Sequence, residues 1–185
     1  MRYHSLFLLA TVAFVAACSN TDSAKNPTGP GSVARPSPDI ISSINDANAP
    51  SGTHLQTGAI GCSVATDLTV SCTTFELAGV GHTNADVSLV AHYTADVLCS
   101  NKGVNPNNSV EAQSTDLTST DNFTATSSKN GRLSVRGASA SVTTSGNPCP
   151  NPNWTPTFTN IVLTDFTYSV TFAGFTQPYI LITGP

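Results

Sequence analysis

The chain has 185 residues, of which 39% are hydrophobic and only 10% are charged, against about 25% in an average soluble domain. Its 7 Lys and Arg against 11 Asp and Glu give a formal net charge of −4, which disfavours a nucleic acid as partner. Serine, threonine and asparagine supply most of the polarity instead, as in many β proteins that act outside the cytoplasm.

The first 17 residues have the parts of a secretory signal peptide in the expected order. Arg2 supplies the positive charge, an apolar run follows over residues 6–17, and Ala16 and Ala17 precede Cys18. The run is too short for a transmembrane helix, which needs about 20 apolar residues. The pattern resembles the signal of bacterial lipoproteins, and an ordinary secretory peptide is the alternative interpretation.

The resemblance to lipoprotein signals implies cleavage before Cys18 and attachment of lipid to its thiol. Several acyl chains on one residue imply stable anchoring, since each buried methylene contributes about 0.8 kcal/mol. Ser19 stands where an inner-membrane retention signal would have Asp. The resemblance therefore implies an extracytoplasmic, lipid-anchored protein of the cell envelope, sorted to the outer membrane if the organism has one.

Residues 18–53 are predicted to form a flexible tether, because they are rich in Pro and Gly among small polar residues. A short helix can form inside it, since Ser37 can cap a helix whose first turn holds Pro38. The isoleucines that would share one face of that helix are Ile40, Ile41 and Ile44. The folded domain is then expected over residues 54–185.

Four cysteines remain when the cysteine of the signal is set apart, and an even number outside the cytoplasm indicates two disulfides. Of the three pairings that four cysteines allow, we favour Cys62 with Cys72, because they flank a short turn symmetrically and a hairpin would bring their sulfurs together. Cys99 and Cys149 then form the second pair and close a loop of about 50 residues. A zinc site is the alternative, although no CxxC or HxxxH spacing supports it.

Apolar residues recur at every second position along most of the domain, which predicts strands with one buried face. Every odd position of residues 87–99 is apolar. In residues 158–172, the side chains expected to point to one face are Phe158, Val162, Phe166, Tyr168, Val170 and Phe172. Weaker strand candidates cover residues 58–65, 68–77, 110–117, 122–127, 132–143 and 179–183.

About seven or eight strands in roughly 130 residues, separated by turn signals, predict an all-β fold. The expected architecture is an immunoglobulin-like β-sandwich of antiparallel strands with two disulfides. A small barrel is the alternative. No stretch of comparable length has the spacing of an amphipathic helix.

Two segments resemble parts of a group of small secreted bacterial β domains that have no assigned activity. They are residues 99–103, which read Cys-Ser-Asn-Lys-Gly, and residues 149–154, which read Cys-Pro-Asn-Pro-Asn-Trp. The resemblance covers residues 58–172 and implies that these loops meet at one end of the domain. The candidate ligand-binding residues of the two loops are Asn101, Asn105, Asn151 and Trp154. Trp154 could stack on a sugar ring, but we favour packing beside Cys149.

The sequence contains no catalytic, metal-binding or cofactor motif that names a reaction. Asp86, His92 and Asp96 share one face of the strand at residues 87–99 and its start. His92 and Asp96 are four residues apart on that strand, about 13 Å by strand rise, which is too far for a direct hydrogen bond. We interpret this row as a solvated strand face.

Two functional hypotheses follow. The first is a non-enzymatic envelope lipoprotein, without cofactor or metal, whose β domain binds an envelope protein or glycan through loops at one end. The alternative is a hydrolase that acts on envelope polymers through an Asp/His site without a recognisable motif. Self-association through exposed edge strands is a third, structural hypothesis.

Overall fold

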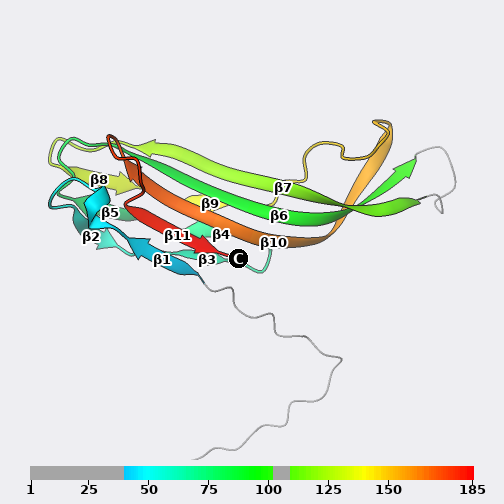
Figure 1. Ribbon diagram of the computed structural model, residues 1–185, viewed down its shortest axis with the longest axis horizontal. Coiled ribbons are helices and arrows are strands. Elements are labelled where there is room, and N and C mark those ends of the chain that lie inside the picture. The colour runs from blue at the N-terminus through cyan, green and yellow to red at the C-terminus, as the bar shows by residue number, and fades with distance from the viewer. Residues whose placement is uncertain (1–39, 102–108) are drawn as a thin grey trace, which may run out of the picture. The chain divides into compact units, whose positions relative to one another are not determined.

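The structure is a computed structural model that describes residues 40–101 and 109–185, so Cys18 and Asn105 lie outside the described residues. Within these ranges the chain forms eleven strands and one short 3-10 helix. Every strand pairing is antiparallel. The strands form two layers, which Figure 1 shows.

The first layer is one large five-stranded sheet. Its strand order is β1 (Ile41–Ile44), β11 (Ile180–Gly184), β10 (Trp154–Phe172), β6 (Ala85–Asn101) and β7 (Ser109–Ala125). Every odd position of β6 from Ala85 to Cys99 is buried, as its alternating sequence predicted. Polar residues occupy most of the even positions, so one face of this sheet is turned to solvent.

Six short strands form the facing layer as two three-stranded sheets. One contains β2 (His54–Gly58), β5 (Phe75–Ala78) and β8 (Arg132–Val135), and the other contains β3 (Cys62–Val64), β4 (Val70–Cys72) and β9 (Ala138–Ala140). Along the chain, β2 leads into β3, β4 into β5 and β8 into β9 across breaks of two or three residues. The facing layer therefore consists of three interrupted strands. Together with the five strands of the large sheet they give a sandwich of eight strands.

The core lies between the two layers. Leu77 and Leu133 of the facing layer and Leu89 and Ile180 of the large sheet are all 0% exposed and belong to one cluster. Burying one such side chain stabilises the fold by about 1.5–3 kcal/mol. The predicted all-β sandwich with two disulfides is confirmed.

Two β-bulges in β10 correct one predicted orientation. One lies before Val162 and one after Leu163, and each adds a residue to β10 that has no counterpart in β6. Val162 therefore lies opposite Thr94 on the outer face, whereas Leu163 lies opposite the buried Tyr93. The prediction that Val162 faces the core is wrong, because strict alternation assumes no extra residue. The second bulge restores the phase, so Phe166 is buried as expected.

The start of the fold also differs from expectation. Ile41–Ile44 forms β1 and pairs with β11, and the 3-10 helix η1 (Asp46–Asn48) follows with Asn45 as its cap. The predicted short helix around these isoleucines is wrong, because the open edge of β11 satisfies their backbone groups better than an isolated helical turn can. The segment from Ile41 onward therefore belongs to the folded domain and not to the predicted tether.

Candidate functional site

The ends of β6, β7 and β10 extend past the facing layer, as Figure 1 shows. We call this extension the arm and define it as residues 95–101 of β6 with their partners in β7 and β10. Because no strand of the facing layer covers the arm, its inner face needs another cover. The loop between β9 and β10 supplies it.

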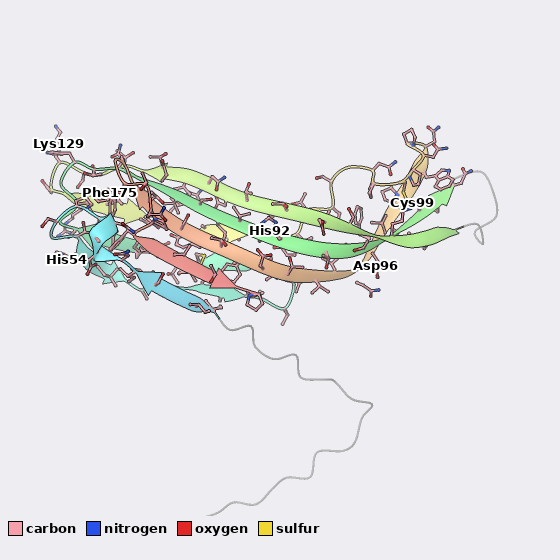
Figure 2. The ribbon with its side chains drawn as sticks, in the orientation of Figure 1. His54, His92, Asp96, Cys99, Lys129 and Phe175 are labelled. Atoms are coloured by element: carbon pink, nitrogen blue, oxygen red, sulfur yellow. A yellow bond between two sulfur atoms is a disulfide. The ribbon has the colours of Figure 1, made fainter. Side chains whose placement is uncertain are left out.

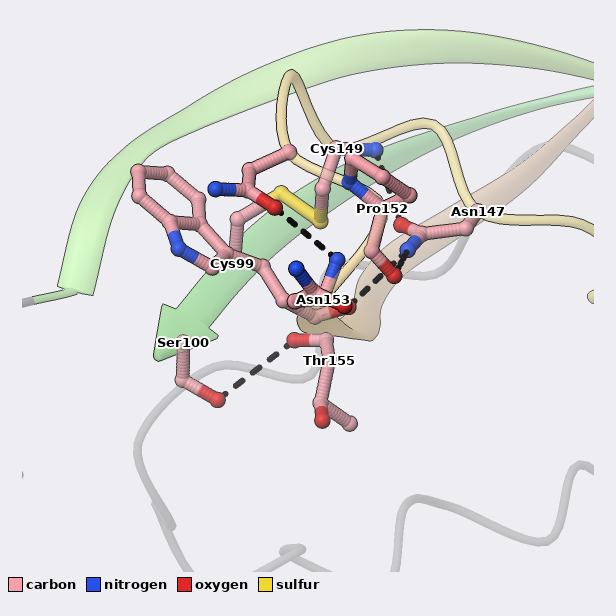
Figure 3. Close-up of a disulfide and its surroundings, with 9 residues drawn as sticks. Cys99, Ser100, Asn147, Cys149, Pro152, Asn153 and Thr155 are labelled. Carbon is pink, nitrogen blue, oxygen red and sulfur yellow. Dashed lines mark hydrogen bonds between the residues drawn. A yellow bond between two sulfur atoms is a disulfide. The ribbon is translucent and has the colours of Figure 1, made fainter. Parts of the chain in front are cut away.

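The disulfide between Cys99 and Cys149 fixes that loop to the arm, as the close-up in Figure 3 shows. Val97 and Cys99 are each 1% exposed, and with Cys149 they form a small core separate from that of the sandwich. Half-buried Trp154 and Phe158 pack against it. Trp154 therefore packs at the disulfide, which is the placement that the sequence favoured over an exposed sugar platform.

Asn147 organises the loop before β10. Its side-chain Nδ2 donates to the carbonyl oxygens of Pro152 and Trp154 at 3.1 and 2.9 Å, and its Oδ1 accepts from the backbone N–H of Cys149 at 3.0 Å. Figure 3 shows Asn147 beside the disulfide. One amide thus holds three backbone groups, so the loop is rigid before any partner arrives.

The structure brings together three of the four predicted loop residues. Asn151 Oδ1 accepts from the backbone N–H of Asn153 at 2.9 Å, and the Asn151 carbonyl accepts from the N–H of Trp154 at 3.0 Å. Trp154 is the register partner of Asn101 in the sheet. Asn101, Asn151 and Trp154 therefore meet at the end of the arm.

The predicted row of Asp and His side chains lies on the outer face of the large sheet, where Figure 2 labels His92 and Asp96. His92 Nδ1 lies 3.2 Å from Thr118 Oγ1, and the residue opposite His92 in β10 is Asp165. Asp96 accepts a hydrogen bond from Asn160 Nδ2 at 2.8 Å. As expected, His92 and Asp96 contact different neighbours and do not bond to each other.

The arginines of the described domain lie in the facing layer and not in the large sheet. None of the five strands of the large sheet contains Lys or Arg. Within the described residues, the salt bridges are Arg132–Glu76 at 2.8 Å and Arg136–Asp121 at 2.7 Å, and both arginines belong to the facing layer. The solvent face of the large sheet consequently carries hydroxyl, amide and carboxylate groups and the His92 imidazole, without a lysine or arginine.

The pair formed by Asp121 and Arg136 joins the two layers at β7. Both carboxylate oxygens of Asp121 accept from Arg136, and one also accepts from the backbone N–H of Ser139 at 3.1 Å. The hydrogen bonds from Arg136 lower the pKa of Asp121. The Arg136 guanidinium also lies 3.8 Å from the centre of the Phe123 ring, a cation–π contact.

The four cysteines of the domain form the two predicted disulfides, Cys62–Cys72 and Cys99–Cys149, so their thiols are not zinc ligands. Cys62 and Cys72 are direct register partners in β3 and β4, as the hairpin argument required. The described residues contain no group of three or more His, Cys, Asp and Glu side chains arranged to hold a metal ion. In the same part of the chain, no helix has the length and apolarity to cross a membrane.

No protein-family model, curated protein or solved structure matches this chain. The resemblance to small secreted bacterial β domains therefore stays a prediction. A functional assignment has to be argued from the residues of this chain alone.

Proposed function

We propose that the chain is a cell-envelope lipoprotein whose β-sandwich is a non-enzymatic binding domain, anchored to a membrane through lipid on Cys18. One observation carries the proposal. The other four cysteines pair with each other, which leaves Cys18 as the odd one, at the end of a signal-like apolar run. Disulfides form and persist in oxidising compartments, and this supports an extracytoplasmic domain.

The binding part of the proposal rests on the end of the arm. Asn147 and Asn151 hold the loop before β10 through backbone hydrogen bonds, and the disulfide fixes the loop to β6. A pre-formed loop pays little conformational entropy when it binds. The exposed amide of Asn153 on this loop suits a partner rich in hydroxyl or peptide groups, so we expect a glycan or a protein of the envelope.

The hydrolase alternative receives no specific support from the arrangement of side chains. A general base has to lie within hydrogen-bond reach of its proton and is usually oriented by a further group. His92 contacts Thr118 and Asp96 contacts Asn160 on an exposed sheet face. We therefore propose only the binding function.

The anchor is tested by replacing the lipid-bearing residue. Cys18→Ser removes the thiol that would carry lipid, so we expect the wild-type protein in the detergent-extracted membrane fraction and the variant outside it. Ser19→Ala is the control and should fractionate like the wild type. Wild-type protein released by a salt wash, or a Cys18→Ser variant that stays with the membrane like wild type, would contradict the anchor.

The binding surface is tested by photo-crosslinking in cells. A photoreactive residue replaces Asn153, an exposed side chain of the arm loop, or Ser71, an exposed side chain on the facing layer. We expect a discrete adduct from position 153 and none from position 71, because only the first lies on the proposed surface. Equal adducts from both positions, or adducts from position 71 alone, would place the binding surface elsewhere.

A further inference from the structure

The exposed edges of the sheets differ in how well they are protected against pairing with another chain. An edge is protected against such pairing when its strand is short, when it contains a bulge or a proline, or when it carries a lysine or an inward-pointing charge. Edge strand β1 has four residues, β2 has a register shift, and the part of β10 beyond β11 carries two bulges. By contrast, β7 has 17 residues and ends the strand order of the large sheet.

The edge of β7 is both long and regular. It pairs with β6 from Gln113 to Ala125 without a bulge. Residues 113–120 contain neither Pro, Lys nor Arg, and Asp116 is their only charged residue. Among the described residues, no strand pairs with β7 on the side away from β6. Within the described ranges, its outward backbone N–H and C=O groups therefore have no strand partner and can pair with another extended chain.

We infer that β7 pairs with β7 of a second copy of this chain, antiparallel about a two-fold axis. An antiparallel strand is complementary to itself, so the same edge supplies both halves of a closed, isologous interface. Core-facing side chains stay on the core side of a continuous sheet only if core-facing residues of one copy lie opposite core-facing residues of the other. With Leu117 on the axis this condition holds, and the two five-stranded sheets become continuous.

The side chains of β7 suit this register. Asp116 then lies opposite Thr118 of the second copy, so each carboxylate meets a hydroxyl donor and not another carboxylate. Ser114 lies opposite Thr120, and Thr115 lies opposite Ser119, which are pairs of small hydroxyl residues that favour cross-strand contact. Asp116, Thr118 and Thr120 are exposed in the single chain.

The facing layer does not obstruct the pairing. Its polar and cation–π contacts with β7 are made at Asp121, which binds Arg136 and Ser139, and at Phe123, which lies under Arg136. Both residues belong to the half of the strand away from the arm. Because the two copies run antiparallel, the facing layer of one copy lies beside the arm of the other. The partner that this edge fits is consequently a second copy, independently of what the arm loop binds.

The test is sedimentation equilibrium on residues 18–185 with Cys18→Ser, exported into an oxidising compartment. We expect a dimer that Thr118→Asp weakens at least about tenfold, because the new carboxylate of each copy lies opposite Asp116 of the other, which makes two like-charge pairs in the interface. Thr118→Lys should leave the dimer as tight or tighter, since the new ammonium faces that carboxylate. Thr167→Asp, on the same face but within the sheet, is the matched control and should not change the dimer.

Three results would overturn the inference. The wild-type chain could be a monomer at about 100 μM. Thr118→Asp could leave the dimer as tight as the control does, which would place the interface elsewhere. Equal weakening by Thr118→Asp and Thr118→Lys would refute pairing in this register. Near-ultraviolet circular dichroism of each variant shows whether the sandwich is folded when its mass is measured.

Discussion

Two buried tyrosines show how a single hydroxyl group affects the stability of this fold. The hydroxyl of Tyr93 lies 3.2 Å from the carbonyl oxygens of Leu68 and Ala140, so it ties the β3–β4 turn and β9 to the large sheet. The hydroxyl of Tyr168 has no hydrogen-bond partner among the described residues. Both rings are 1% exposed, so they bury similar apolar surface and differ in polar satisfaction.

We predict opposite effects for the two matched substitutions. Tyr93→Phe should lower the free energy of unfolding by about 1 kcal/mol, because it removes a satisfied buried hydroxyl and strips two carbonyls of a donor. Tyr168→Phe should leave it unchanged or raise it by about 1 kcal/mol, because it removes an unsatisfied one. Urea denaturation of both variants measures the difference. A larger loss for Tyr168→Phe than for Tyr93→Phe would contradict this account.

Burial of the Tyr168 hydroxyl predicts a loss of stability at alkaline pH. Burial raises the pKa of Tyr168 to about 12, whereas an unfolded tyrosine titrates near its ordinary value of 10. Between these values the folded state binds the extra proton, so this contribution is complete below about pH 10 and declines as the pH rises toward 12. Tyr168→Phe should flatten that part of the stability curve, whereas an unchanged slope would contradict the assignment.

At the scale of elements, the two disulfides support different parts of the fold. Cys62 and Cys72 join neighbouring strands within the main core, whereas Cys99 and Cys149 hold the separate small core of the arm. Chain entropy predicts a contribution of about 3 kcal/mol for the first and about 4 kcal/mol for the second, in a model-dependent estimate. The two disulfides are therefore distinguished better by which part of the fold loses stability on their removal than by how much stability is lost.

We predict that Cys99→Ala with Cys149→Ala opens the arm while the sandwich stays folded. Without the disulfide, the loop no longer covers Val97, and amides of residues 95–101 should lose protection from hydrogen exchange. Amides near Leu89 and Ile180, in the main core, should keep theirs. The matched control, Cys62→Ala with Cys72→Ala, should leave the arm protected. Uniform loss of protection in the first variant would refute independent cores.

The long strands and the Cys62–Cys72 disulfide were predictable because their signals are local, and Cys99–Cys149 followed as the remaining pair. Alternation of apolar residues along β6 gave both the strand and its buried face, and the symmetric spacing of Cys62 and Cys72 gave a hairpin pair that the register confirms. Runs predicted separately at residues 110–117 and 122–127 form the single strand β7, because pairing with β6 continues across the polar residues between them.

The bulges of β10 left a trace in the sequence that strict alternation overlooks. Ile161, Val162 and Leu163 are three consecutive apolar residues, and Asn160 before them has a positive φ of 50°, which Asn tolerates better than most residues. Such a run is a signal for a phase change. The bond from Asn160 to Asp96 and the position of Asp165 opposite His92 depend on that register, so no local pattern could have predicted them.

At the scale of the whole molecule, β1 shows the limit of composition as a guide. Its residues follow a Pro-rich segment and were assigned to the tether, yet they complete the edge of the large sheet beside β11. An exposed four-residue strand has little signal of its own, because its stability comes from a partner more than 130 positions away in the chain. The loop residues Asn151 and Trp154 were easier to place, since the disulfide fixes their loop to Cys99. The role of Asn147 was not predicted, because it consists of bonds to backbone groups that only the folded loop brings together.

The central claim is that the chain is an envelope protein with a lipid on Cys18 and two disulfides in its domain. The most direct test is the intact mass of the membrane-extracted protein, measured after thiol alkylation with and without prior reduction. We predict a mass that begins at Cys18 and includes a diacylglyceryl or triacyl group, with four alkylated thiols only after reduction. A mass without lipid, or thiols that are alkylated without reduction, would contradict the account.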